Sequence, residues 1–328
     1  MKLHAAPLTI LSVALCAGAL AATPAGAQAY PAKPIRVIVP FPPGGTSDIL
    51  TRLIGAEITK GWGQQVLADN RPGANGNIGV EMLARAAPDG YTLVLMDVGN
   101  LTISPSVFQK LPFDIIRDLA PVSMISYSPH LLSVHPAVPA RSVKELIALA
   151  KKQPGKLNYS TGLGGAPHLA GLLFEQRAGI RWLTVPGKGG TQSMLTVITG
   201  ECDVLFLGML QSVHHVKSGK VKALAVSSDQ RDPALPDVQT VGETPGLEGF
   251  VTGSWQGVLA PARTPPEVIA KLNAEMTRII QLPDIRKNLA SQGTTPLPMS
   301  PPEFGKWLIE QKERWAKLVK DTGFKLDN

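Results

Sequence analysis

The segment that decides the fold is residues 35–48, which reads IRVIVPFPPGGTSD. Its first five residues are β-branched apart from one arginine, and this composition favours a strand. A turn rich in proline and glycine follows, and Ser47 to Thr59 then places apolar residues at helical spacing. A strand that leads through a glycine-rich turn into an amphipathic helix is typical of α/β proteins.

The first 27 residues predict a signal peptide. An apolar run from Leu8 to Leu20 follows Lys2, and the small residues of Ala25 to Ala27 supply a cleavage site. Ala27 to Ala29 offers an alternative site. A retained membrane anchor would need about 20 unbroken apolar residues, and Pro24 interrupts this run. We therefore expect a secreted protein whose mature chain is not inserted into the membrane.

Strands and helices alternate along the rest of the chain. Strands are expected near residues 65–68, 92–96, 131–134, 157–160, 204–207, 223–227 and 257–260. Helices are expected near residues 78–86, 143–152, 168–178, 191–199, 266–281 and 302–322. A mature chain of this length suits two cores of ordinary size. We predict two α/β lobes with a ligand cleft between them and a hinge that the chain crosses twice, with lobe 1 at 28–127 plus 251–328 and lobe 2 at 128–250.

The charge pattern favours a small anionic ligand over nucleic acid. The net charge is +7 and is spread along the chain without a run of five basic residues. Such a diffuse positive field attracts small anions, whereas nucleic-acid binding calls for basic clusters and aromatic stacking residues. The mature chain holds one cysteine, Cys202, so it offers no intramolecular disulfide, and we expect this side chain to be buried.

Three glycine-rich turns are candidate anion sites. In the first, Gly44 and Gly45 allow close approach of the backbone to a ligand, and Thr46 or Ser47 is expected to cap the helix. The backbone amides at such a helix start can bind an anion. Asp48 lies in the first helical turn, where it either complements the helix dipole or contacts the ligand.

The second and third turns lie farther along the chain. Residues 159–168 read YSTGLGGAPH between a predicted strand and a predicted helix, and His168 there is either a ligand donor or a packing residue. Lys188 lies in the segment VPGKGG at 185–190, which also precedes a predicted helix. Loops of this kind, one from each lobe, could face each other and bind a carboxylate through backbone amides.

Signatures of common enzymes are absent from the sequence. The dinucleotide pattern Gly-x-Gly-x-x-Gly fails because Pro167 stands three residues after Gly164. Neither Gly-x-Ser-x-Gly nor His-Glu-x-x-His occurs. The pair His214 and His215 would point about 100° apart on a helix, which is poor geometry for one metal ion. We expect no catalytic residue, no metal and no cofactor.

Several motifs together resemble one family. They are PFPPGGTSD at 40–48, DNRPGANGNIG at 69–79, PDGYTL at 88–93, VPGKGG at 185–190, ALAVSS at 223–228, LPDV at 235–238 and LAPARTP at 259–265. In this order they resemble the Bug family, the TctC-like substrate-binding proteins of tripartite tricarboxylate transporters. The likeness covers essentially the whole mature chain.

The resemblance implies a type II periplasmic-binding-protein fold that closes on a carboxylated solute in the periplasm, with a two-subunit membrane permease as partner. It implies that loop amides and hydroxyls of both lobes hold the carboxylate. By position, this role falls on Phe41, Gly44, Gly45, Thr46, Asp48, Gly99, Asn100, Thr161, Gly162, Gly164, Gly165, Ala166, His168, Lys188, Gly189, Asp203 and Gly208.

One departure bears on the ligand. Gly187 stands where the family usually has a tyrosine, and if that ring faces the pocket, its loss is expected to change or enlarge the pocket wall. The family binds di- and tricarboxylates, acidic amino acids and aromatic acids, so the resemblance gives a class of ligand and not a compound. The alternative function is a ligand-sensing module that docks on a signalling receptor.

Overall fold

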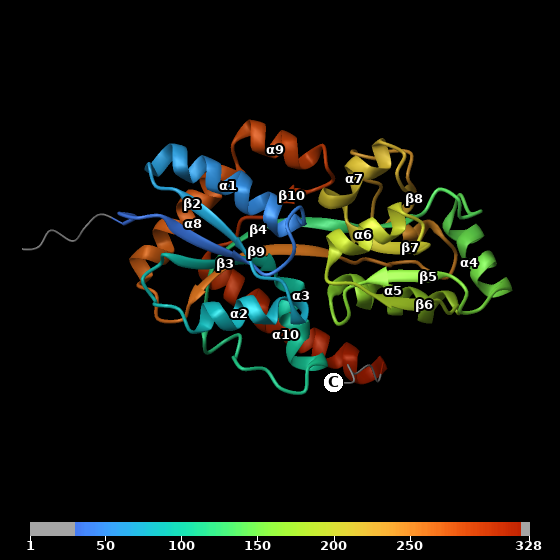
Figure 1. Ribbon diagram of the computed structural model, residues 1–328, viewed down its shortest axis with the longest axis horizontal. Coiled ribbons are helices and arrows are strands. Elements are labelled where there is room, and N and C mark those ends of the chain that lie inside the picture. The colour runs from blue at the N-terminus through green and yellow to red at the C-terminus, as the bar shows by residue number, and fades with distance from the viewer. Residues whose placement is uncertain (1–29, 323–328) are drawn as a thin grey trace, which may run out of the picture.

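The computed structural model describes residues 30–322, so the predicted signal peptide at 1–27 lies outside the described residues. Figure 1 shows an elongated molecule in which two groups of elements lie side by side. Two strands, β4 (Leu119–Val134) and β9 (Gly253–Pro261), run between the groups. Within the described range, no helix combines the length and the apolar character that a membrane span requires.

The first group is built on parallel strands. These are β1 (Ile35–Val39), β2 (Val66–Asn70) and β3 (Thr92–Asp97), and β9 pairs antiparallel with β3. Apolar side chains along these strands point alternately to the two faces of the sheet, and each face contributes to a separate core. One core includes α1 (Thr46–Trp62), α8 (Pro266–Ile280) and α9 (Pro283–Ala290), and the other includes α2 (Asn77–Ala84), α3 (Val98–Val107) and α10 (Pro301–Thr322).

The second group surrounds the other half of β4. Strands β5 (Asn158–Thr161), β6 (Leu183–Pro186) and β7 (Val204–Gly208) are linked by parallel pairing through β5, and β7 and β8 (Lys222–Val226) flank β4 in antiparallel orientation. The helices are α4 (Val143–Lys152), α5 (Ala166–Ala178), α6 (Gly190–Ile198) and α7 (Met209–Lys217). The aromatic rings of Phe174, Trp182, Phe206 and Phe250 pack together in the main core here, partly stacked and partly edge to face.

The two connections between the groups lie next to each other. The first part of β4 pairs with β9 from Leu119 to Pro129, and its last part pairs with β7 and β8 from His130 onward. Pro129 is the register partner of Gly253, where β9 begins. The predicted α/β class is confirmed. The lobe boundaries remain a prediction, and we keep the names lobe 1 and lobe 2 for the two predicted stretches.

Several details of the sequence-based expectation differ from the structure. The prediction that Thr46 or Ser47 caps α1 is wrong, because the N-cap is Gly45 and no side chain accepts from the helix start. The Ser47 hydroxyl instead donates to Gln256 Oε1 at 2.7 Å. Helix α3 was not expected, and β4 is longer than the predicted strand at 131–134. Cys202 is buried and unpaired, as predicted.

Candidate functional site

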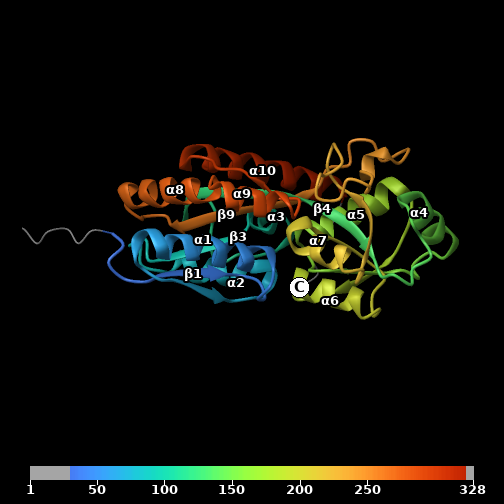
Figure 2. The ribbon, with the colours of Figure 1, turned by 90° about the horizontal axis from the view of Figure 1, so that it is seen from above.

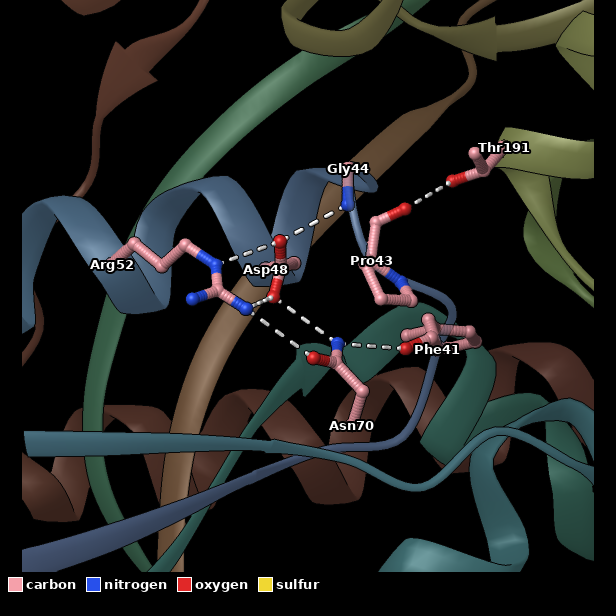
Figure 3. A network of polar contacts seen from close by, with 7 residues as sticks. All are labelled: Phe41, Pro43, Gly44, Asp48, Arg52, Asn70 and Thr191. Carbon is pink, nitrogen blue, oxygen red and sulfur yellow. Dashed lines mark hydrogen bonds and ion pairs between the residues drawn. The ribbon is translucent and has the colours of Figure 1, made fainter.

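The loop between β1 and α1 is held in place by Asp48 (Figure 3). One carboxylate oxygen accepts from the Gly44 amide at 3.0 Å and from Arg52 Nε at 3.0 Å, and the other accepts from Asn70 Nδ2 at 3.1 Å. Asn70 Nδ2 also donates to the Phe41 carbonyl at 3.1 Å. Burial disfavours the charged form, but these hydrogen bonds outweigh it and lower the pKa of Asp48. The carboxylate therefore organises the loop.

Four helices begin at glycines in this region. The N-caps of α1, α5, α6 and α7 are Gly45, Gly165, Gly189 and Gly208, which have no side chain to cap the helix. Side chains from elsewhere accept from one amide of α5 and one of α7: Ala166 N donates to Asn100 and Leu210 N donates to Ser128. The first amides of a helix lack intrahelical partners and carry the positive end of the helix dipole. Convergence of such helix starts makes a region that favours an anion.

A cavity of about 660 Å³, here called the outer chamber, lies between the lobes and is bordered by Gly165 and Gly189. Its walls are mainly apolar, with rings of Phe41, Phe108 and Phe206 and several prolines. Lys188 is the one charged side chain that lines it among the described residues. The chamber can therefore hold the apolar part of a ligand.

A smaller cavity of about 70 Å³, the inner chamber, adjoins the outer one, and the two share the lining residues Phe41, Asn100, Pro167, Gly190 and Leu207. Its lining is more polar and includes two of the glycine N-caps, Gly45 and Gly208. Two helix starts therefore meet polar side chains at this end of the site.

A buried hydrogen-bond chain forms one wall of the inner chamber. Ser47 donates to Gln256, Gln256 Nε2 donates to Ser254 Oγ at 2.8 Å, and Ser254 donates to Asp97. The Gly99 amide also donates to Asp97, at 2.9 Å, so this carboxylate caps α3. Burial raises the pKa of Asp97 to about 6, although the Ser254 hydroxyl and neighbouring amides favour its charged form. The chain connects the starts of α1 and α3.

Three hydrogen bonds join the lobes across the site. Thr191 Oγ1 donates to the Pro43 carbonyl at 3.3 Å, as Figure 3 shows. Asn75 Nδ2 donates to the Gly164 carbonyl at 3.0 Å. The Ala166 amide donates to Asn100 Oδ1 at 2.8 Å. The lobes are therefore in contact around the chambers.

Most of the residues predicted for the site line one of the two chambers. These are Phe41, Gly45, Thr46, Asn100, Thr161, Gly162, Gly165, Lys188, Gly189 and Gly208. The structure brings together residues from five separate segments of the chain.

The other seven predicted residues do not line the chambers. Gly44, Gly99, Gly164, Ala166 and Asp48 lie behind the lining and support it through the hydrogen bonds described here. His168 is buried and its Nδ1 accepts from the Gly164 amide at 3.1 Å, while burial lowers its pKa to about 4. Asp203 precedes β7 at the end opposite Gly208 and accepts from the Asn158 amide at 2.7 Å. We do not include these seven in the ligand-binding proposal.

Sequence reasoning missed several lining residues. Asn75 adopts a positive φ of 55° in the short turn Ala74–Gly76, and its segment belongs to the DNRPGANGNIG motif, which could have signalled a tight turn near the ligand. Ser193 in α6 lines the outer chamber with a buried hydroxyl that has no partner among the described residues. Phe108 and Phe206 carry no local signal, because only the fold brings them to the chamber.

The fold and the site define a two-lobed solute-binding protein. The model of the tripartite tricarboxylate transporter family receptor, TctC, matches residues 50–324, and the chain belongs to this family. It is 34% identical to BugT of Bordetella pertussis over 321 residues, which cover 97% of this chain and 98% of BugT.

Two solved structures extend the likeness to three dimensions. The periplasmic binding protein BugD matches with a TM-score of 0.86 and 31% identity over 90% of this chain and 100% of BugD. An R. palustris protein with adipate matches with a TM-score of 0.87 and 31% identity over 90% of this chain and 100% of that protein. The predicted resemblance to the Bug family and the predicted periplasmic-binding-protein fold are both confirmed. Members of the family are periplasmic solute-binding proteins and not enzymes.

Proposed function

We propose that this protein captures a small organic acid in the periplasm between its two lobes. The observation that carries the proposal is the set of four glycine-capped helix starts that border the chambers, Gly45, Gly165, Gly189 and Gly208. A helix start with glycine as its N-cap can bind a carboxylate through the backbone amides that no side chain occupies and through the helix dipole, without a cationic side chain. The adipate bound to the R. palustris relative is an acid of this class.

The two chambers suggest how the acid is oriented. The carboxylate lies at the inner chamber, near the starts of α1 and α7, and the body of the acid extends into the outer chamber. Phenylalanines and prolines line the outer chamber, which favours an apolar body over a second or third carboxylate. Among the classes that the resemblance allows, aromatic acids fit this lining best.

The space for such a body is connected with Gly187. A Cβ atom at this position would lie 2.9 Å from Ser193 Oγ, and both residues line the outer chamber, so a larger residue would displace that hydroxyl or extend into the chamber. We propose that glycine at this position admits bulkier acids than the tyrosine usual in the family.

A thermal-shift screen of the mature protein tests this function. The panel contains mono-, di- and tricarboxylates, amino acids and aromatic acids, each paired with its uncharged primary amide. A ligand at a hundredfold excess over its Kd stabilises the folded state by about 2.7 kcal/mol, which corresponds to about 5 °C in a protein of this size. We expect shifts for acids with an apolar body and none for their amides. Equal shifts for acid and amide would contradict carboxylate recognition.

We further propose that the loaded protein delivers its ligand to a two-subunit membrane permease, as family membership suggests. Uptake of the labelled acid by cells measures this step. Deletion of the gene is expected to abolish uptake of that acid at low concentration. If uptake persists while a transcriptional response to the acid disappears, the protein serves a signalling receptor instead.

A further inference from the structure

A second cavity between the lobes lies away from the chambers. It is enclosed by one side of α5, by residues 249–255 and by the part of α10 around Arg314 to Lys317, and it is called the rear cavity here. Figure 2 shows α10 on the side of the molecule opposite α6, which borders the outer chamber. The rear cavity has a volume of about 340 Å³, within the range of small-molecule sites.

Three cationic side chains, Arg177, Arg314 and Lys317, border the rear cavity, and no acidic side chain of the described residues does. None of the three forms an ion pair with a carboxylate in the part of the chain that the structure describes. Arg177 is held by a hydrogen bond of 3.2 Å from Nη1 to the Glu248 carbonyl. The Arg314 guanidinium lies 6.0 Å from the centre of the Trp315 ring. Their positive charge is therefore available to an anion.

The wall between these cations is apolar and partly flat. The indole rings of Trp255 and Trp315 line the cavity, and Leu169 and Leu173 of α5 complete the wall. Indole faces bind flat apolar groups by stacking. An occupant with both an aromatic body and a negative charge would satisfy this lining, whereas a small inorganic anion would leave the indoles exposed.

A buried histidine provides an independent sign of an occupant. His130 lines both the rear cavity and the inner chamber, and it is buried, with only 1% of its surface exposed. Its Nδ1 is 3.0 Å from Thr252 Oγ1, but its Nε2 has no hydrogen-bond partner among the described residues. A buried polar atom without a partner is destabilising, and a bound molecule or water could supply one.

We propose that the rear cavity is a second binding site, which takes a small organic anion with a flat apolar body, such as an aromatic carboxylate or sulfonate. Occupation of this site does not require the chambers to be empty, because α5 and His130 stand between them. The proposal does not depend on the proposed function, which concerns the chambers.

Calorimetric titration of the mature protein with 1-naphthalenesulfonate tests the second site. The informative variant is Arg314→Glu, and its matched control is Lys306→Glu, which makes the same change of charge on α10 outside the cavity lining. Arg314 is exposed, so its replacement leaves the core intact. We expect Arg314→Glu to weaken binding about fivefold or more and Lys306→Glu to leave it within twofold. Lys317→Glu provides a second variant and should behave as Arg314→Glu does.

A variant of the outer chamber separates the two sites. Gly187→Tyr places a ring at the wall of the outer chamber, in a segment that does not line the rear cavity, and it should leave binding of the probe to the rear cavity unchanged. Loss of probe binding in Gly187→Tyr but not in Arg314→Glu would place the probe in the chambers and overturn the proposal. Absence of binding to the unmodified protein would overturn it too, as would equal weakening in Arg314→Glu and Lys306→Glu.

Discussion

The contact between the lobes at Gly165 yields a quantitative prediction for the substitution Gly165→Ala. A Cβ atom at Gly165 would lie 2.9 Å from Asn75 Oδ1 and 3.2 Å from Asn100 Oδ1. Both asparagines form hydrogen bonds across the site, from Asn75 to the Gly164 carbonyl and from the Ala166 amide to Asn100. Both side-chain amides have to shift to admit the methyl group, and we expect both hydrogen bonds to weaken or break.

The effect on ligand affinity follows from these two hydrogen bonds. Each contributes about 0.5–1.5 kcal/mol, so loss of both destabilises the closed arrangement by about 1–3 kcal/mol. We expect an open form, with the lobes apart, to lack these contacts and to be unaffected by their loss. At about 1.4 kcal/mol for each tenfold change, we expect the Kd of the best acid from the screen to rise about fivefold to a hundredfold.

Gly162→Ala is the matched control for this substitution. Gly162 lies in the same loop and also borders the outer chamber, but a Cβ atom there would meet its nearest neighbour at 3.7 Å, an ordinary contact. Isothermal titration calorimetry measures both variants, and thermal unfolding without ligand shows that both are folded. Alanine at the N-cap of α5 lowers the stability of Gly165→Ala by about 1 kcal/mol, in the open and closed forms alike. A Kd for Gly165→Ala within twofold of that for Gly162→Ala would refute the reasoning.

Three further substitutions test other parts of the site. In Asp97→Asn, the titration of a buried carboxylate is removed. Because the pKa of Asp97 is raised to about 6 in the folded protein, its ionisation favours unfolding as the pH rises. The free energy of unfolding of the unmodified protein, measured with urea and compared with that of the variant, should fall by about 2 kcal/mol between pH 4 and pH 7. Asp48→Asn should lower stability by about 1–3 kcal/mol at pH 7. This difference should shrink as the pH falls below about 4, because the pKa of Asp48 is lowered in the folded protein and the stabilisation from its charged form is lost on protonation. Gly187→Tyr should weaken binding of bulky aromatic acids about tenfold or more and spare short acids in the thermal-shift screen, and equal effects on both would contradict the role given to Gly187.

The sequence predicts those parts of the fold whose signals are local. Helix α4 begins and ends as expected at Val143 and Lys152, because Ser142 caps an amphipathic segment. Helix α3 escaped prediction because nearly all of its residues are buried, which removes the amphipathic pattern, and because it contains Gly99 and Pro105. Only the last part of strand β4 was predicted, because Pro121 and Pro129 look like strand breaks in the sequence. In the structure the strand continues through both prolines, and its two halves pair with different strands.

The candidate site likewise has a part that the sequence predicts and a part that it does not. The glycine-rich turns that cap α1, α5 and α6 are visible in the sequence, since glycine between a strand and a helix marks such a turn. The apolar wall is not visible, because Phe108 and Phe206 come from segments about a hundred residues apart, and a buried phenylalanine of a wall looks like any core residue.

The most direct test of carboxylate binding by glycine-capped helix starts is a crystal structure of the mature protein with the best acid from the screen. We expect the carboxylate oxygens within about 3.2 Å of backbone amide nitrogens in the first turns of α1, α6 or α7, with the apolar body against Phe108 and Phe206. A carboxylate bound to the Lys188 side chain at the mouth, with the apolar end at the helix starts, would contradict the account.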